Sequence, residues 1–231
     1  MIDNYVVVDL ETTGLKAKED KIIEIGAIKI VNGKEADRFE TFVNPARTIP
    51  PIITRVTNIS NQMVSNAPYI EEITDHFMEF LGDSVLLGHN LMFDYSFIKR
   101  VAVNAGYTYE RKGLDTLKLA RKYLTDVESK KLDFLCQYFE IEDENHHRAL
   151  NDARATYRLY NILCERYGAD ADEPISLNYK VKKENPITER QKKYLLNLIV
   201  KNNLSVDFEI ARLSKSEASR NIDLIISQYG R

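Results

Sequence analysis

Cysteine is nearly absent from the 231-residue chain, which contains only Cys136 and Cys164. Both lie in apolar stretches of helical character, so we expect reduced core residues rather than a disulfide or a metal-binding pair. Long hydrophobic runs are also missing, because no apolar stretch approaches the roughly 20 residues that cross a bilayer. The N-terminus carries no basic leader before its first predicted strand. These absences predict a cytoplasmic protein with no membrane partner.

Net charge is small as well, since 32 basic and 35 acidic side chains leave only −3. This small net charge argues against an enzyme that binds long nucleic acid nonspecifically. The charge is unevenly distributed: residues 180–231 carry 11 basic and 6 acidic groups, whereas residues 1–179 carry 21 and 29. The basic C-terminal part indicates either a separate nucleic-acid contact or an ordinary solvated surface, and both interpretations stay open.

Several segments carry the composition of strands. A β-branched run begins at Val6, and a second predicted strand covers Lys21–Val31. The dipeptide Asn32–Gly33 predicts a hairpin turn to a third strand, Glu35–Val43. Ser84–Leu87 predicts a short buried strand. The length suits one α/β core with a small appendage.

Helical periodicity follows the first three strands. Strands first, then alternating strands and helices, predict an α/β fold in which a mixed sheet is flanked by helices on both sides. The helical segments are Ile52–Val64, a helix that begins at Pro68 and includes Phe80, Phe93–Ala105, Leu114–Tyr123, Leu132–Phe139 and Ala149–Tyr167.

The C-terminal part predicts a small helical module. Residues 169–186 lack periodicity and are typical of a linker. Beyond them, the capping boxes Thr188 with Gln191 and Ser214 with Glu217 each predict the start of an amphipathic helix. We therefore expect a main domain of residues 1–168 and a module of residues 187–231. At this size the module is expected to dock on the main domain or on a partner.

Two acids end the first predicted strand. Asp9 and Glu11 are alternate residues, so their carboxylates share one face and lie roughly 7 Å apart along the chain. Like charges at the end of a buried strand repel each other and are costly to desolvate. A hard divalent cation is the commonest reason to keep such a pair. The alternative is a pair of solvated carboxylates that cap the following turn.

Further acids stand at helix starts. Asp94 lies in the first turn of a predicted helix beside Phe97 and Ile98, and so is expected to face inward. Stabilisation of the helix dipole is the competing explanation for this acid. Asp152 opens the last helix of the main domain among apolar neighbours. His147 lies five residues earlier, so the two side chains meet only if His147 precedes the helix.

The residue types favour particular chemistry. Four acids without companion cysteines favour Mg²⁺ or Mn²⁺ over zinc. An acidic site with one histidine nearby suits phosphodiester hydrolysis with two metal ions. His147, with an ordinary pKa near 6.5, is suited to take a proton from the attacking water. We leave out His146, and Asp115 is equally well explained as a helix cap.

Three segments carry a family resemblance, in order along the chain: DLETTGL, GHNLMFD and HRALND. They resemble the three motifs of the DnaQ-like (DEDDh) 3′→5′ exonucleases, a family that includes the epsilon-like proofreading exonucleases of bacterial DNA polymerase III. The likeness covers residues 5–168. It implies a ribonuclease H-like fold and the stepwise removal of nucleoside 5′-monophosphates from a 3′ end.

The resemblance also assigns roles by position. It implies two divalent ions, Mg²⁺ or Mn²⁺, with His147 as general base and Thr12 and Thr13 beside the terminal nucleotide. The metal-binding residues that it implies are Asp9, Glu11, Asp94 and Asp152.

The sequence therefore predicts a metal-dependent 3′→5′ exonuclease acting on the 3′ end of single-stranded or frayed DNA, in proofreading or repair. A DNA polymerase is a candidate partner. RNA trimming is the alternative that keeps the chemistry. A binding module that has lost catalysis is disfavoured, because no acid of the motifs is missing.

Overall fold

The computed structural model describes residues 4–141, 148–169 and 173–230. The chain forms two compact units, which are described separately. The body comprises Met1–Pro45 and Ile49–Val181, and the C-terminal unit comprises Ala46–Thr48 and Lys182–Arg231. None of the helices within the described ranges has the length and apolarity needed to traverse a bilayer.

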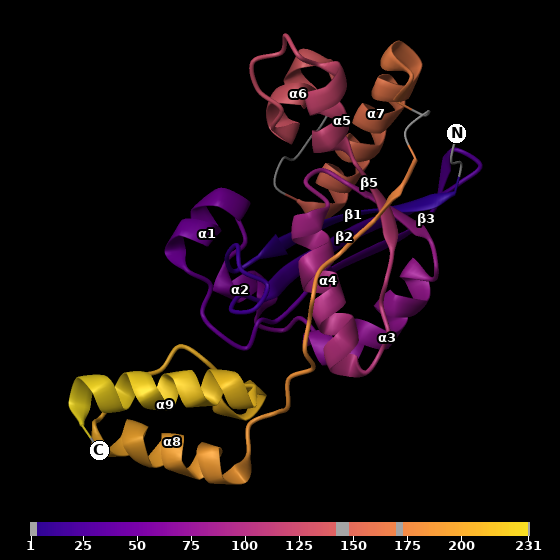
Figure 1. The fold of residues 1–231 in the computed structure, drawn as a ribbon. Helices are drawn as coiled ribbons and strands as arrows, with labels where there is room; N and C mark the ends of the chain where they lie inside the picture. The colour runs from indigo at the N-terminus through magenta and orange to yellow at the C-terminus, as the bar shows by residue number, and fades with distance from the viewer. Residues whose placement is uncertain (1–3, 142–147, 170–172, 231) are drawn as a thin grey trace. The chain divides into compact units, whose positions relative to one another are not determined.

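The body is built on a six-stranded mixed sheet with the strand order β3-β2-β1-β4-β5-β6 (Figure 1). The central strand β1 pairs in antiparallel fashion with β2 and in parallel fashion with β4. Asn32 and Gly33 both have positive φ, which is the geometry of the predicted tight hairpin between β2 and β3. The strands are β1 (Tyr5–Thr12), β2 (Ile22–Val31), β3 (Lys34–Phe42), β4 (Val85–Gly88), β5 (Lys112–Asp115) and β6 (Ile175–Ser176).

Nine helices of the described chain surround these strands or follow them, one of them (α2) a single turn, together with a short 3₁₀ turn at Ile210–Arg212. In the body they are α1 (Pro51–Thr57), α2 (Asn61–Val64), α3 (Ile70–Leu81), α4 (Met92–Ala105), α5 (Thr116–Tyr123), α6 (Leu132–Tyr138) and α7 (Ala149–Tyr167). The C-terminal unit contains α8 (Glu189–Lys201) and α9 (Lys215–Tyr229).

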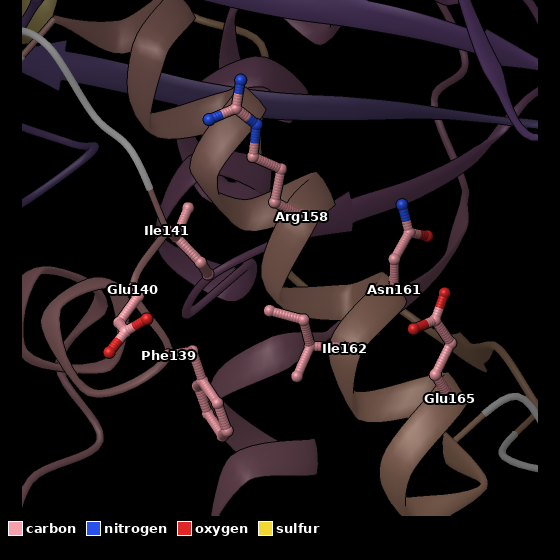
Figure 2. A pocket seen from close by; sticks show the side chains of 7 residues that line it. All are labelled: Phe139, Glu140, Ile141, Arg158, Asn161, Ile162 and Glu165. Atoms are coloured by element: carbon pink, nitrogen blue, oxygen red, sulfur yellow. The ribbon is translucent and has the colours of Figure 1, made fainter.

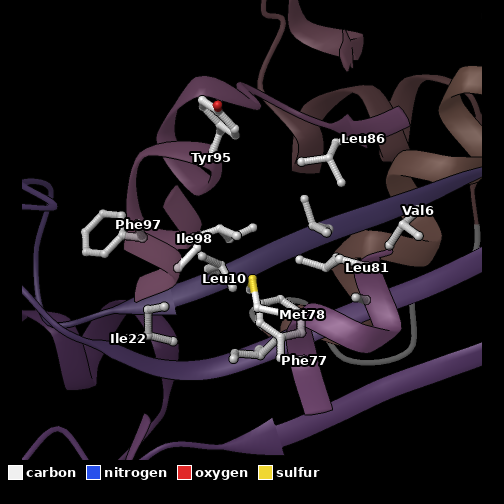
Figure 3. Packing of buried hydrophobic residues seen from close by; sticks show 14 of the residues in the cluster. Val6, Leu10, Ile22, Phe77, Met78, Leu81, Leu86, Tyr95, Phe97 and Ile98 are labelled. Carbon is white, nitrogen blue, oxygen red and sulfur yellow. The ribbon is translucent and has the colours of Figure 1, made fainter. Parts of the chain in front are cut away.

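The two faces of the sheet carry separate cores, because successive strand residues point to opposite sides. Val6, Val8 and Leu10 of β1 pack with residues of α3 and α4 in one cluster, of which Figure 3 shows Val6 and Leu10 together with Phe77, Leu81 and Ile98. On the opposite face, Tyr5 and Val7 pack with residues of α5, α6 and α7. The predicted α/β fold, with helices on both sides of a mixed sheet, is confirmed.

Both cysteines, Cys136 in α6 and Cys164 in α7, are buried free thiols, as expected. The body differs from the sequence prediction at two short strands. Lys112–Asp115 forms β5, although the sequence suggested only a helix from Leu114 onward. Residues 169–186 were expected to form a linker, yet Ile175–Ser176 pairs with β5 as β6 and Leu177 is buried in the core. Both strands are too short for an alternation pattern to reveal them.

The C-terminal unit confirms the two predicted capping boxes. Thr188 caps α8 by accepting a hydrogen bond from the Gln191 N–H group, and Ser214 caps α9 through Glu217 in the same way. The apolar faces of α8 and α9 meet around Leu195 in a small core of their own.

Candidate active site

The site begins at the end of β1, on the face that packs against α7. Asp9 and Glu11 alternate with Leu10, so they share the face of Tyr5 and Val7. In the register with β2, Asp9 lies opposite Gly26 and Glu11 lies opposite Glu24. The two carboxylates therefore emerge where a buried strand meets the start of a helix.

Helix α7 supplies a third carboxylate. Its N-cap is Arg148, and Asp152 lies in its first turn, held there by the hydrogen bond from the Asp152 N–H to the Arg148 carbonyl at 3.0 Å. Carboxylate oxygens of Asp9, Glu11 and Asp152 lie within 4.8 Å of one another. The structure thus brings together three of the four predicted metal-binding acids.

Asp94 lies behind this group rather than within it. The side chain is 3% exposed, and its Oδ1 accepts a hydrogen bond from the Leu10 N–H at 3.0 Å. Because Leu10 separates Asp9 from Glu11, this bond ties α4 to the backbone between the two strand acids. Asp94 faces inward, as the sequence predicted, and its charge acts on Asp9.

The electrostatics of the acids reflect their crowding. Burial, followed by the charges of Asp94 and Asp152, raises the pKa of Asp9 well above its usual range. Burial and then the charges of Asp152 and Glu24 raise the pKa of Glu11 to about 8. Burial also raises the pKa of Asp94, although the hydrogen bond from the Leu10 N–H opposes the shift. Without a cation, the acids favour bound protons over full ionisation.

A divalent cation fits these residues. The donors are all carboxylate oxygens, which hard cations prefer. A cation placed among the three carboxylates would remove the mutual repulsion that raises their pKa values. Carboxylates whose mutual repulsion destabilises the fold when no cation is bound are suited to hold a metal ion rather than to serve a purely structural role.

The other residues predicted to belong to the site are His147, Thr12 and Thr13, and Asp115 was an ambiguous candidate. His147 lies outside the described residues. Thr12 and Thr13 are buried, and their hydroxyl groups shape the loop after β1. The Thr12 hydroxyl donates to the Gly14 carbonyl at 2.6 Å, and the Thr13 hydroxyl accepts from the Lys21 N–H at 2.9 Å. Their contact with a nucleotide stays a prediction. Asp115 caps α5 through the Leu117 N–H at 3.0 Å.

Sequence reasoning missed the residues that surround the start of α7. Glu24 is 1% exposed, and its carboxylate accepts from both the Arg148 side chain and the Ala149 N–H. The available signal was a lone acid within the apolar run IIEIGAI, which a buried strand tolerates only when the charge is paired.

A cavity of about 380 Å³ lies elsewhere, between α7 and the segment after α6 (Figure 2). Arg158 and Glu165 of α7 line one side, and Phe139 lines the other. It contains none of the predicted site residues. The acidic group is therefore separate from this cavity.

Fold and site together define a nuclease-like α/β protein with an acidic, metal-binding centre. The exonuclease family model matches residues 6–160, which is more than half of the chain. The chain belongs to this family, the DnaQ-like exonucleases, as its three motifs suggested.

Curated relatives include PolC-type DNA polymerase III proteins. The protein from Caldanaerobacter subterraneus subsp. tengcongensis is 48% identical over 162 residues, which is 70% of this chain and 12% of that polymerase. The protein from Clostridium perfringens is 44% identical over 170 residues, with 74% and 12% covered. The chain thus spans only about an eighth of the length of these relatives.

Solved structures of exonucleases share the fold. Exonuclease X in complex with 5′ overhanging duplex DNA superposes with a TM-score of 0.58 at 25% identity, covering 71% of this chain and 93% of that chain. A structure of exonuclease I superposes with a TM-score of 0.65 at 18% identity, covering 72% and 42%, and supports the fold alone.

Proposed function

We propose that the body is the catalytic domain of a metal-dependent 3′→5′ exonuclease that shortens single-stranded or frayed DNA and releases nucleoside 5′-monophosphates. One observation carries the proposal: carboxylates of Asp9, Glu11 and Asp152 converge from a strand and a helix within 4.8 Å. Membership of the exonuclease family supports cleavage at a chain end.

The four acids are proposed to hold two divalent ions, Mg²⁺ or Mn²⁺. Bound ions of this kind lower the pKa of water and stabilise charge on the leaving oxygen. Asp9, Glu11 and Asp152 provide the converging oxygens. Asp94 holds the backbone at Leu10 and adds negative charge behind Asp9.

His147 is proposed as the general base that accepts the proton of the attacking water. It directly precedes Arg148, the N-cap of α7, and a neutral imidazole can accept a proton near neutral pH. This role rests on the sequence and on the family motif. Thr12 and Thr13 are proposed to shape the loop beside the terminal nucleotide, since both hydroxyls already bind within that loop.

DNA is the proposed substrate because relatives are DNA polymerases and a structural neighbour was solved with a DNA duplex. Matched DNA and RNA oligonucleotides of one sequence, compared by initial rate, test this preference. Faster digestion of DNA is expected. Faster digestion of RNA would replace the substrate in the proposal with an RNA 3′ end.

Metal dependence is tested with a labelled single-stranded oligonucleotide in Mg²⁺, in Mn²⁺ and in EDTA. We expect digestion with either ion and none in EDTA. Digestion that continues in EDTA, or a folded protein that is inactive with both ions, would contradict the proposal.

The wider setting is also a proposal. We propose residues 1–168 as the catalytic domain and residues 187–231 as an accessory module, in a protein of the cytoplasm. Residues 169–186 are proposed as the connection between them, which adds β6 and Leu177 to the sheet and core of the body before it leads to the module. A DNA polymerase is the proposed partner, on the basis of the curated relatives. The basic surplus of residues 180–231 supports DNA contact by the accessory module.

A further inference from the structure

An ion pair between the buried Glu24 and the partly exposed Arg148 joins β2 to the start of α7. Glu24 Oε1 accepts from Arg148 Nε at 3.0 Å and from an Arg148 terminal nitrogen at 2.6 Å, while Oε2 accepts from the Ala149 N–H at 3.2 Å. The Arg148 guanidinium also lies 4.5 Å from the centre of the Phe42 ring. Glu24 therefore holds both the N-cap and the first residue of the helix that carries Asp152.

Gly26, two residues along the same face of β2, lets the helix approach the strand. A Cβ atom at this position would lie 2.1 Å from the backbone carbon of Ala149 and from the nitrogen of Leu150. No side chain fits there without moving α7. Since Gly26 lies opposite Asp9 in the strand register, this close approach occurs directly beside the metal-binding acids.

We propose that Glu24, with Arg148 and Gly26, positions Asp152 for metal binding, so that β2 sets the geometry of a site whose acids lie on other elements. The inference rests on the proposed function and extends it to residues outside the group of converging acids. Glu24 is a positioning residue: it acts through Arg148 and the start of α7.

A purely structural attachment of α7 to the sheet does not account for this pair. The helix forms a second, bidentate ion pair farther along, in which Arg154 donates hydrogen bonds to Glu35 of β3 at 3.1 and 2.8 Å. That pair is about one-third exposed on both side chains, and Arg154 lies two residues beyond Asp152 rather than at the start of the helix. Glu24 instead stands opposite Glu11, where its charge adds to the repulsion among the acids. An acid at that position is costly unless it fixes something at the site.

The test measures metal affinity directly and activity separately. Mn²⁺ alone is titrated calorimetrically into the full chain, and kcat and KM are measured on a single-stranded DNA oligonucleotide. The variants are Glu24→Gln, Glu24→Ala and Arg148→Lys. Glu35→Ala is the matched control, because it removes an equivalent two-pronged pair from the same helix.

We expect Glu24→Ala to weaken Mn²⁺ binding and to lower kcat by about 10- to 100-fold, with KM within twofold of the wild type. Glu24→Gln and Arg148→Lys retain part of the hydrogen bonding and should lie between. Glu35→Ala should leave both quantities unchanged. Equal effects of Glu24→Ala and Glu35→Ala, or wild-type Mn²⁺ affinity in Glu24→Ala, would overturn the inference.

A double variant separates geometry from charge. Glu24→Gln with Arg148→Met removes both charges and the tether, while the net charge of the site stays the same. Positioning predicts that Mn²⁺ affinity remains at least about tenfold weaker. A double variant that binds Mn²⁺ with wild-type affinity would contradict the positioning role and would show that the single variants act through charge. An inactive wild type that still binds Mn²⁺ would instead contradict the proposed function alone.

Discussion

Asp152→Asn is the substitution for which the structure makes the sharpest prediction. The change keeps the shape of the side chain and removes one of three carboxylates that lie within 4.8 Å of one another. It should lower kcat by at least about a hundredfold, because bound ions supply several kcal/mol of transition-state stabilisation. The metal-free variant should nevertheless be more stable than the wild type.

The size of this stabilisation follows from the geometry. At 4.8 Å, the upper limit of the separations, and an effective dielectric constant of about 20, repulsion between Asp152 and one ionised neighbour amounts to about 3.5 kcal/mol; only one such pair is counted, because the other carboxylate retains a proton. The lost interaction of Asp152 with the α7 dipole opposes this by about 0.3–1 kcal/mol. A net gain of about 2–3 kcal/mol corresponds to a rise in melting temperature of about 5–10 °C.

The assay is thermal unfolding in EDTA at pH 9, where the acids are most fully ionised, repeated with Mg²⁺. Asp133→Asn is the matched control, because Asp133 is an exposed acid in the first turn of α6. The control should shift the melting temperature by less than about 2 °C. A metal-free Asp152→Asn protein that melts below the wild type, or one that keeps full activity, would refute the reasoning.

Three further predictions follow from the same structure. Because the pKa of Glu11 is raised from 4.5 to about 8, the metal-free folded protein keeps a proton that the unfolded chain has lost. Its free energy of unfolding should therefore fall as the pH rises across that range. The rise in melting temperature that Mg²⁺ produces should grow over the same range. A melting temperature in EDTA that increased over the same range would contradict this. Leu177→Ala should lower the free energy of unfolding in urea by about 2–5 kcal/mol, since Leu177 is buried in the core beside β6. A decrease below about 0.5 kcal/mol would show that residues 175–177 are a linker rather than part of the core. Deletion of residues 182–231 should weaken binding of long oligonucleotides and reduce its salt dependence without changing Mn²⁺ affinity, whereas an unchanged salt slope would exclude DNA contact by that segment.

The sequence predicts the elements that carry the site because their signals are local. Helix α7 begins and ends at the predicted residues, and its end coincides with Gly168 at positive φ. The two acids of β1 follow directly from strand alternation. Their partner Asp152 follows from an acid in an apolar first turn.

Other features depend on tertiary structure and leave little trace in the sequence. Asp94 was predicted to face inward, but its hydrogen bond to the Leu10 N–H requires the packing of α4 against β1. The position of Glu24 opposite Glu11 depends on the register between β1 and β2, which the sequence does not reveal. The role of Gly26 likewise depends on the distance between β2 and α7, which no local pattern encodes.

The direction of digestion tests the central claim most directly. One single-stranded DNA oligonucleotide is labelled at its 5′ end in one sample and at its 3′ end in another, and both are incubated with Mg²⁺. The account predicts a ladder of products shortened one nucleotide at a time from the 5′-labelled strand. The 3′-labelled strand should release labelled mononucleotide at once. Immediate release of mononucleotide from the 5′ label, internal cuts in both strands, or no cleavage by the folded protein would contradict it.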